Sequence, residues 1–592
     1  MKTMKILAIF ISALLISCGG GNSESIYDYP DDEGSSGKTD NDKDTDSDNA
    51  DSKTDDTDAQ ESGNDNDAEN HDGGDTQTDD SDNDKDNPDN DTTEPDGDND
   101  ETHNDNDNDE QEIPEEPELP DAEVNFEKAV FVDKYYGNDS NNGTKTAPVK
   151  TLGKAITLAN AFDRNQIILS GKLFDEFPQI KNGVSIFGGY RNNEGTWNEI
   201  DDLTSFKIPA TGWKLDNLQD IAFSKIKFST KEKEPGEETD PGESSIGLIL
   251  RNCKNIQFLN VLIVTANGAD GANGEDGEKG DDGEQGSKGV QGCEYSTAGL
   301  CSGPCPLPQG GAGGVSTCGA TGGKGGDAGA ASSHGENGGN GTGSTTNGGL
   351  GGNMNHLTSD SAEECTENPQ SNGKNGNNGK VGSDGKGGKS FGEFSDSGYT
   401  NADGEDGETG ENGQGGGGGG GGKGGTAFCN SYGSSGGGGG AGGCGGQGGG
   451  GGQGGGASIP LMLFSSKNIY FDSTTLETGK GGKGGNGAYG AFGGSGALGG
   501  EAGPYGGSGE QNDGGCGGNG GMGGAGGKGG NGGGGGGGPT ICIVTKGSTI
   551  LNESSITYVR RTPGEGGEGA YYGEKGKSAD KFDLDLDIEP EE

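Results

Sequence analysis

The chain has few of the groups on which most catalysis and membrane insertion depend. Its 592 residues include four histidines and two tryptophans, and only 25% are hydrophobic. The histidines lie in acidic or glycine-rich sequence, so we expect none of them to act as a general base on a rigid scaffold. Lysine and arginine number 41 against 98 aspartates and glutamates, and the net charge of −57 disfavours nucleic-acid binding. Beyond the first 18 residues, no apolar run is long enough to cross a membrane.

Charge and glycine are concentrated in different segments. Residues 25–123 carry most of the excess negative charge, whereas most of the 134 glycines follow residue 267. A segment with so much charge of one sign and so few apolar residues does not form a packed core. We therefore expect a disordered acidic tether over 18–122 and one modest core in the remaining, strand-forming sequence.

The first residues resemble a bacterial lipoprotein signal. A basic start precedes a short apolar run, and the sequence L-I-S-C that ends at Cys18 matches a lipobox. The resemblance implies a signal peptide over 1–17 and a lipid on Cys18. By the sorting rules of such lipoproteins, Gly19 favours the outer membrane or the cell surface, so the membrane is an expected partner. Periplasmic and outward-facing display both remain open.

Alternating carboxylates in the acidic tether resemble those of calcium-binding loops. The candidate ligands are Asp84, Asp86, Asp89, Asp91, Asp96, Asp98 and Asp100. A calcium loop also needs a turn glycine and a distant bidentate glutamate, and these segments lack that full pattern. The alternative is a self-repelling tether that holds the folded part away from the membrane. Apart from weak calcium binding, the sequence predicts no metal and no cofactor.

A strand–turn–strand pattern recurs four times, beginning at Trp213, Leu248, Leu461 and Ile541. Apolar residues alternate with polar ones within each copy, which predicts strands, and a unit this short buries its apolar face only by stacking. Aligned without a gap, the copies place Leu215, Leu250, Leu463 and Ile543 in one inward slot, and Phe223, Phe258, Phe471 and Leu551 in another. We therefore expect Leu250 beside Leu463, Phe258 beside Phe471, and Leu463 beside Ile543.

The polar residues of the four copies predict structure more strongly than catalysis. Asp220, Asn255, Asn468 and Ser548 occupy equivalent positions, where a stack forms a polar ladder at a bend. Arg251 is isolated in the sequence. Because no cluster of stacked carboxylates is evident, we expect a protein that is not an enzyme. The alternative is a polysaccharide lyase or hydrolase whose carboxylates come together from different rungs; Asp216 or Asp220 within about 6 Å of a second carboxylate would favour it.

The segment after the acidic tether resembles the opening of right-handed parallel β-helix proteins. The matching residues are Val130, Val132, Asp133, Gly137, Asn138, Asp139, Asn142, Gly143, Thr144, Ala147, Pro148, Lys150, Thr151, Leu152 and Ala155. They follow the motif of a group of unknown function in the pectin-lyase-like superfamily. The resemblance implies an all-β, right-handed parallel β-helix whose open end is capped by a helix that begins at Thr151.

Long excursions with glycine at every third position interrupt the predicted stack. Period three matches the polyproline-II helix, but the near absence of proline and the adjacent ends of each excursion disfavour a collagen triple helix. Antiparallel polyglycine-II helices that run out and back satisfy both constraints, and such bundles resemble those of glycine-rich antifreeze proteins and some phage tail adhesins. Disordered low-complexity loops are the alternative.

Cysteines and aromatic residues supply the remaining candidates. Eight cysteines lie in glycine-rich sequence and are disulfide candidates: Cys293, Cys301, Cys305, Cys318, Cys365, Cys429, Cys444 and Cys516. Tyr190 and Trp197, in G-G-Y-R-N-N-E-G-T-W, are candidates for stacking on a sugar, although they also fit a structural role in a rung and its turn.

The expected organisation has eight parts. They are a signal peptide (1–17), an acidic linker (18–122), the first part of the β-helix (123–267), a glycine-rich insertion (268–457), a rung (458–478), a second insertion (479–538), a rung (539–562) and a glycine-rich, acidic tail (563–592). The expected function is adhesion, or contact with the envelope or matrix, through an extracellular polysaccharide or protein. A polysaccharide-active enzyme and binding to ice or a mineral surface are the alternatives.

Overall fold

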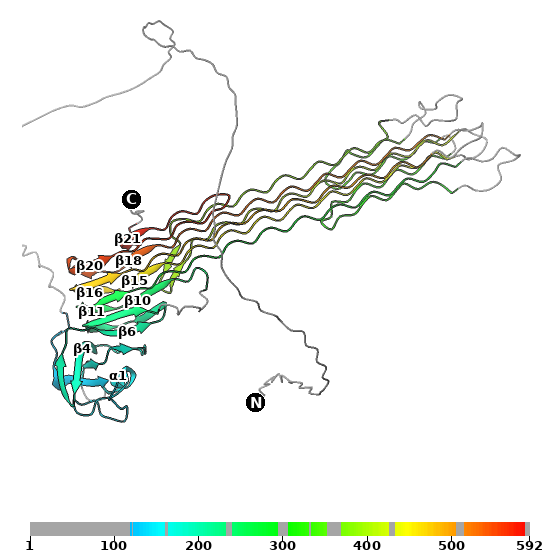
Figure 1. Ribbon diagram of the computed structural model, residues 1–592. Helices are drawn as coiled ribbons and strands as arrows, with labels where there is room; N and C mark the ends of the chain where they lie inside the picture. The colour runs from blue at the N-terminus through cyan, green and yellow to red at the C-terminus, as the bar shows by residue number, and fades with distance from the viewer. Residues whose placement is uncertain are drawn as a thin grey trace, which may run out of the picture. The chain divides into compact units, whose positions relative to one another are not determined.

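The computed structural model describes residues 119–120, 122–159, 164–231, 240–293, 306–330, 333–351, 369–425, 432–504 and 514–586. Cys18, the seven candidate calcium ligands and Cys301, Cys305, Cys365 and Cys429 lie outside these residues. The described chain forms a stack of parallel strands from which a long glycine-rich bundle extends (Figure 1). No helix in these ranges combines the length and apolar character that a membrane span requires.

The stack consists of three sheets whose main strands are all parallel. The first contains β1 (Ala129–Asp133), β2 (Gln166–Ser170), β4 (Ser185–Asn193), β8 (Gln219–Ser224), β11 (Lys254–Leu259), β16 (Lys467–Asp472) and β19 (Ile550–Leu551). The second contains β7 (Thr211–Asp216), β10 (Ser245–Arg251), β15 (Ser458–Phe464), β18 (Thr540–Lys546) and β21 (Ser578–Asp583). The third contains β3 (Leu173–Phe174), β6 (Thr204–Ile208), β9 (Ile226–Thr230), β12 (Leu262–Val264), β17 (Thr474–Glu477) and β20 (Ile556–Val559). Successive coils such as β10–β11–β12 contribute one strand to each sheet, which confirms a parallel β-helix.

Like residues of successive coils stack across the first glycine-rich excursion. Leu250 of β10 pairs with Leu463 of β15, and Phe258 of β11 pairs with Phe471 of β16. The rings of Phe223, Phe258 and Phe471 form a column with centroids 5.5 and 5.4 Å apart. All of these side chains are fully buried. The predicted neighbours 213 residues apart in the sequence are therefore confirmed.

The predicted register of the fourth copy is wrong by two residues on β18 and by one residue on β19, where Leu551 pairs with Tyr470 instead of Phe471. Leu461 pairs with Ile543, and Leu463 pairs with Thr545 instead. Ile541 belongs to a second buried cluster, with Ile459 and Met462, on the opposite face of the sheet. Because a shift of two residues preserves the alternation, and because β18 is buried on both faces, the apolar pattern alone does not select the register.

An element within the first glycine-rich excursion covers the outer face of the second sheet. It is the hairpin of β13 (Glu393–Ser395) and β14 (Gly398–Thr400), which the sequence analysis did not predict. Phe394 and Tyr399 of this hairpin pack with Phe582 of β21 against the second cluster. β21 itself, in the segment expected to be a tail, adds a further strand to β18. The second sheet is therefore buried on both sides.

Left-handed residues make the bends between the strands of each coil. Asp220, Asn255 and Asn468 have φ of 55–56° in equivalent positions. The amide nitrogen of Asn255 donates to Asp220 at 2.7 Å, and that of Asn468 donates to Asn255 at 2.9 Å. This confirms the polar ladder for three coils. In the fourth, Thr549 rather than Ser548 accepts from the backbone of Asn468, so the side-chain ladder ends there.

A helix closes the first coil of the stack, as the family resemblance implied. α1 (Leu152–Ala159) buries Leu152, Ala155 and Ile156 against the core. The Asp139 carboxylate accepts hydrogen bonds from the backbone of Lys150 and from both the backbone and the hydroxyl of Thr151, at 2.9–3.0 Å. The aspartate of the G-N-D motif therefore fixes the chain at the point where the capping helix begins.

The remaining elements lie around the first coils. β5 (Thr196–Glu199) pairs antiparallel with β4, and the short helix η1 (Phe126–Lys128) precedes β1. The second short helix, η3 (Glu553–Ser555), joins β19 to β20 in the last complete coil.

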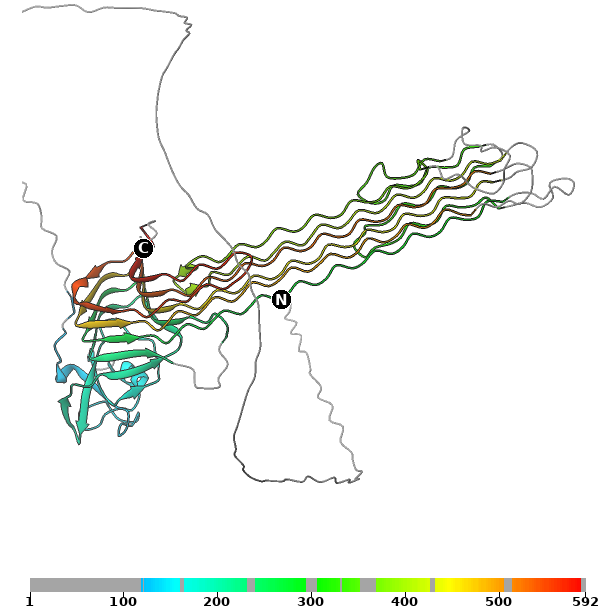
Figure 2. The same cartoon turned by 45° about the horizontal axis from the view of Figure 1, so that its top comes forward.

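The glycine-rich excursions run out from the stack and back to it (Figure 2). Each straight segment is called an arm here. The longest arms are 268–293, 402–425, 433–457, 479–504 and 514–538, and a shorter one spans 372–390. Every third residue of an arm donates its backbone N–H to the same neighbouring arm, as Gly271 does to Lys483 and Gly274 to Asn486. This is polyglycine-II packing, and 25 residues at 3.1 Å each give an arm of roughly 75 Å.

Arm 433–457 lies at the centre of a ring of six segments. The successive residues Gly436, Gly437 and Gly438 donate to residues 326, 518 and 287, and accept from residues 311, 419 and 500. Each acceptor or donor belongs to a different segment. An added Cβ on Gly440 would lie 2.1 Å from the Ala497 carbonyl oxygen, which is far inside van der Waals contact. A fully surrounded arm therefore has no space for side chains.

The number of glycines per triplet follows the number of neighbours. Arm 268–293, at the edge, has glycine at every third residue, whereas arm 514–538 has glycine at two residues in three along most of its length. Continuous glycine appears at 415–422 and 532–538, where shorter segments add further neighbours. Cys444 of arm 433–457 forms a disulfide with Cys318, which lies in a turn of a neighbouring segment. Beyond this point the arm carries larger side chains, and those of Gln447 and Gln453 accept hydrogen bonds from arm 268–293.

Replacing Leu463 by alanine should destabilise the protein by about 2–5 kcal/mol, because it removes a fully buried side chain from the stack. Tyr470 of β16 faces outward and is only half-buried, so its replacement by alanine should lower the free energy of unfolding by less than half as much. Denaturant unfolding measures both. Equal losses for the two variants would contradict the stacked-rung core.

Replacing Gly440 by alanine should lower the free energy of unfolding by about 1–3 kcal/mol or more, because the new methyl group overlaps the backbone of arm 479–504. Ser495→Ala, at an exposed position of that neighbouring arm, is the matched control and should change stability by less than about 0.5 kcal/mol. A Gly440→Ala protein that unfolds at the wild-type denaturant concentration would refute close packing around arm 433–457.

Candidate binding face of the glycine-rich bundle

The two sugar-stacking candidates lie in the packing of the first coils. Tyr190 and Trp197 are only 8% and 7% exposed, and they pack with Phe131 and Phe187 outside the first sheet. The Trp197 ring lies 4.8 Å from that of Phe131, and its indole nitrogen donates to the Lys145 carbonyl oxygen. Their ring faces are used within the protein, so this geometry favours the structural role that the sequence also allowed.

The described cysteines fall into two classes. Cys318 and Cys444 form a disulfide between a turn of the bundle and its central arm, and Cys293 and Cys516 are also disulfide-bonded. Cys253 and Cys542, by contrast, are free thiols inside the β-helix. Burial raises the pKa of the Cys542 thiol to about 12 and raises that of Cys253 as well. Neither thiol is therefore expected to react as a nucleophile.

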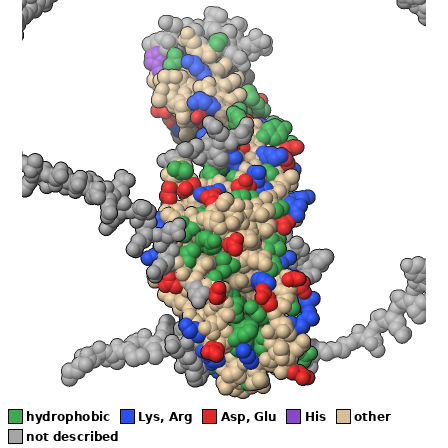
Figure 3. Space-filling view, turned by 90° about the vertical axis from the view of Figure 1, so that its left-hand side faces the viewer, with side chains coloured by type: hydrophobic (Ala, Val, Ile, Leu, Met, Phe, Trp, Pro, Cys, Tyr) green, Lys and Arg blue, Asp and Glu red, His purple; other side chains and the backbone are tan. Residues whose placement is uncertain are grey.

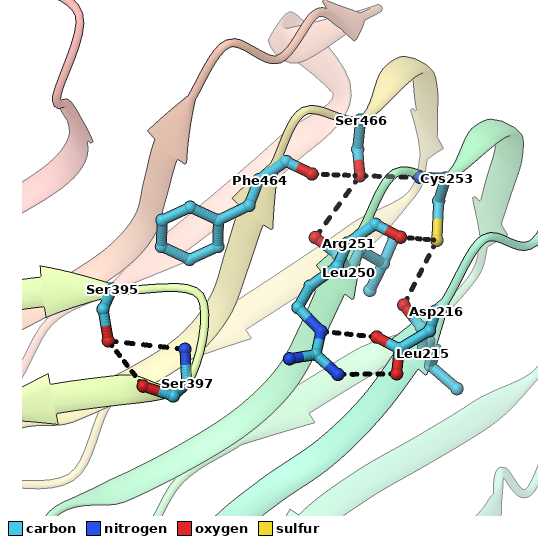
Figure 4. A network of polar contacts seen from close by, with 9 residues as sticks. All are labelled: Leu215, Asp216, Leu250, Arg251, Cys253, Ser395, Ser397, Phe464 and Ser466. Atoms are coloured by element: carbon cyan, nitrogen blue, oxygen red, sulfur yellow. Dashed lines mark hydrogen bonds and ion pairs between the residues drawn. The ribbon is translucent and has the colours of Figure 1, made fainter.

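Arg251 is not isolated in the structure, which corrects the reading of the sequence. It lies on β10 directly beside Asp216 of β7, and its guanidinium donates to both carboxylate oxygens, at 2.5 and 2.6 Å (Figure 4). Next to this pair, the Cys253 thiol donates to the Leu215 carbonyl oxygen, and the Ser466 hydroxyl accepts from the Cys253 backbone. The network joins three successive coils.

Asp216 and Asp220, the candidate carboxylates of the coils, are both bonded to side chains of the next coil. The hydrogen bond from Arg251 lowers the pKa of Asp216 below its ordinary value, and partial burial only partly opposes this effect. Asp220 accepts from Asn255 within the ladder. A carboxylate that is held ionised is a poor general acid. In the described part of the chain, no group of three or more histidine, cysteine, aspartate or glutamate side chains is arranged to hold a metal ion.

Three arms lie side by side as an outer layer of the bundle. Arm 514–538 bonds to arm 479–504 on one side and to arm 372–390 on the other, for example through Gly523 to Ala497 and Gly376 to Met522. Beneath them, arms 433–457 and 402–425 form a second layer, since Gly437 donates to Gly518 and Gly521 donates to Gly417. We call the outer surface of the three arms the flat face.

Exposed apolar side chains occur along the flat face. Because a polyproline-II helix has three residues per turn, positions three apart point the same way. Tyr489, Phe492 and Leu498 share one such row on arm 479–504, and Tyr489 and Phe492 are 75% and 74% exposed. Met522 and Val381, on the two adjoining arms, are also exposed. Lys528 lies over the Phe492 ring, 5.8 Å from its centroid.

Asparagine and aspartate before glycine hold the arms in register. Five side chains of arm 268–293 and the residue before it accept hydrogen bonds from backbone N–H groups of arm 479–504, and each donor lies 213 residues after its acceptor in the sequence. The acceptors are Asn267, Asp270, Asn273, Asp276 and Asp282. Asn372, Asn375, Asn378 and Asp384 do the same for arm 514–538. Much of the bundle's polar sequence is therefore structural. The sequence showed glycine at every third position. It did not show that Tyr489, Phe492 and Leu498 are exposed, because that depends on which arms lie beside arm 479–504.

Comparisons with known proteins found two partial structural matches and no match to a family model or a curated protein. Two crystal structures of the GH136 lacto-N-biosidase from Eubacterium ramulus, a selenomethionine derivative and the native protein, are similar to part of it, with 21% and 19% identity. Each match covers 23% of this chain and 27% of the other, with TM-scores of 0.16 and 0.15. Matches this partial carry no argument about activity.

The ion pair of Arg251 and Asp216 should contribute little to stability, because both side chains are about a third exposed. A double-mutant cycle with Arg251→Gln and Asp216→Asn should give a coupling of about 1 kcal/mol or less at pH 7. Since the folded pKa of Asp216 is lowered, this coupling is present above the unfolded value near 3.9 and is lost as the pH falls through the lowered value. Coupling that grows on acidification would contradict this assignment.

Proposed function

We infer that this protein is a non-catalytic, surface-anchored lipoprotein that presents the glycine-rich bundle for adhesion to an extracellular polysaccharide or protein. In this proposal, Cys18 carries the lipid, residues 18–122 form the tether, and the β-helix is the base of a stiff projection. The stack is assigned to the pectin-lyase-like group of unknown function on the motif from Val130 to Ala155.

The exposed apolar row on the flat face is the observation that carries the proposal. Large apolar side chains are not needed to hold the arms together, because backbone hydrogen bonds and the asparagine and aspartate side chains do so. Tyr489, Phe492, Leu498, Met522 and Val381 nevertheless project from an ordered surface. Large apolar side chains that gather on one exposed face are typical of an interaction site. On the face of the molecule in Figure 3, hydrophobic side chains are interspersed with acidic and basic ones.

The size of these side chains favours a flexible or contoured partner over a crystal surface. A flat crystal lattice is contacted evenly only by side chains of similar length. Phe492, Ser495 and Leu498 follow one another in the same row and differ in size, so the row is uneven. Catalysis gains no support from the coils, where Asp216 and Asp220 are bonded to Arg251 and Asn255. The exposed apolar side chains of the flat face therefore favour adhesion over both catalysis and binding to ice or a mineral surface.

Anchoring and display are tested together on intact cells. The wild-type protein should fractionate with the outer membrane and be removed by external protease, whereas Cys18→Ser should abolish lipidation and membrane retention. Resistance to protease on intact cells would refute outward display, and unchanged fractionation of the Cys18→Ser variant would refute the lipid anchor.

Adhesion is tested with the flat face. Cells that display Phe492→Ser, Leu498→Ser and Met522→Ser together should lose most of their retention on immobilised extracellular matrix. A matched variant with three exposed polar changes on the edge arm, Glu275→Gln, Glu278→Gln and Glu284→Gln, should be retained normally. Equal retention of cells with and without the protein would refute adhesion.

A further inference from the structure

The C-terminal glycine-rich segment forms a step on the bundle. Residues 563–577 fold back on themselves, with Gly573 bonded to Gly567 and Gly576 bonded to Gly564, and we call them the C-terminal hairpin. The hairpin lies against the root of the bundle, where Gly487 bonds to Glu568 and Gly534 bonds to Tyr571. Its turn at residues 570–572 ends part-way along the arms, so the surface beyond the turn is one layer lower.

A hollow of about 500 Å³ lies at this step. Four segments contribute to its lining: arms 268–293, 479–504 and 514–538 and the turn of the C-terminal hairpin. Two tyrosines from different segments, Tyr489 and Tyr572, line it and are 75% and 72% exposed. Such rings offer apolar faces beside a polar hydroxyl, which suits a ligand that is apolar on one side and rich in hydroxyl groups on its edges.

The polar lining is held in place by the backbone. One side-chain oxygen of Asn273, Asn486, Asn531 and Asp276 accepts from the backbone of Asn486, Glu568, Gly490 and Tyr489 respectively, at 2.8–3.1 Å. This fixes each side chain through one atom. The three amide nitrogens and the second oxygen of Asp276 make no hydrogen bond within the described part of the chain. They are therefore preorganised donors and an acceptor for a bound molecule.

The charge of the hollow selects among hydroxyl-rich ligands. Asp276 and Glu568 line it, and none of its lining residues is a lysine or arginine. A uronic-acid chain or a sulfated chain would bring negative charge next to these two carboxylates without a compensating cation. Ring faces, fixed amide donors and carboxylate acceptors together match the hydroxyl groups and apolar ring faces of a neutral sugar.

We propose that the hollow between Tyr489 and Tyr572 is a binding site for a neutral saccharide. The proposal deepens the adhesive function proposed above and rests on it for its biological role, but binding itself is a property of the purified protein. The site is distinct from Tyr190 and Trp197, whose rings are buried against the outside of the first sheet.

The test is titration calorimetry of the purified full-length protein with maltohexaose, cellohexaose and laminarihexaose, and with hexagalacturonate as an acidic probe. At least one neutral hexasaccharide should bind, and hexagalacturonate should bind at least tenfold more weakly. Tyr489→Ala combined with Tyr572→Ala should weaken binding about tenfold or more, through the loss of two ring contacts. Tyr571→Ala is the matched control, because this exposed tyrosine of the same turn does not line the hollow.

A second variant separates the ligand contact from folding. Asn486→Asp retains the oxygen that accepts from Glu568 but replaces the amide donor and adds negative charge, so binding should fall while the unfolding midpoint stays within experimental error. Failure of all three neutral probes to bind, or equal binding by the double tyrosine variant and wild type, would overturn the saccharide site. Loss of cell adhesion in the Phe492, Leu498 and Met522 variant would still support the broader function in that case.

Discussion

Every part of the bundle depends on the requirement that each glycine-rich excursion begin and end on adjacent coils of the β-helix. Thr265 leaves the stack beside Ser458, where the chain returns 193 residues later, and their hydroxyl groups are 2.8 Å apart. Arms that start from fixed, neighbouring positions must run out and back. The stacked core of leucine and phenylalanine therefore sets the spacing and the direction of arms that contain almost no hydrophobic residues.

Glycine then decides how the arms pack. A polyglycine-II arm gives its hydrogen bonds to neighbours rather than to itself, so its stability depends on how many arms surround it. Where six segments surround arm 433–457, a Cβ would overlap a carbonyl oxygen, and the sequence is nearly all glycine. Where an arm lies at the edge, two residues of each triplet are free to vary. Large side chains are consequently restricted to the surface of the bundle, and the exposed aromatic residues occur there.

This division explains why the acidic and amide residues of the bundle serve two purposes. Asn273 and Asp276 use one oxygen to hold the adjoining arm in register, which leaves the second polar atom directed outward in a fixed place. In the β-helix, by contrast, the side chains of Asp220, Asn255 and Asn468 bond to one another in the ladder. An interaction surface is therefore more readily built on the bundle than on the stack that supports it.

The sequence by itself determined the parallel β-helix, the capping helix at Thr151, the partners of Leu250 and Phe258, and the glycine period of the arms, because each follows from a local repeat. It did not determine the register of β18, since a shift of two residues keeps the same alternation on a strand buried on both faces. Nor did it reveal that Arg251 meets Asp216, that residues 393–400 cover the second sheet, or that Tyr489 and Tyr572 share a hollow. Those arrangements join segments 35 to more than 180 residues apart, and only the tertiary packing of coils and arms brings them together.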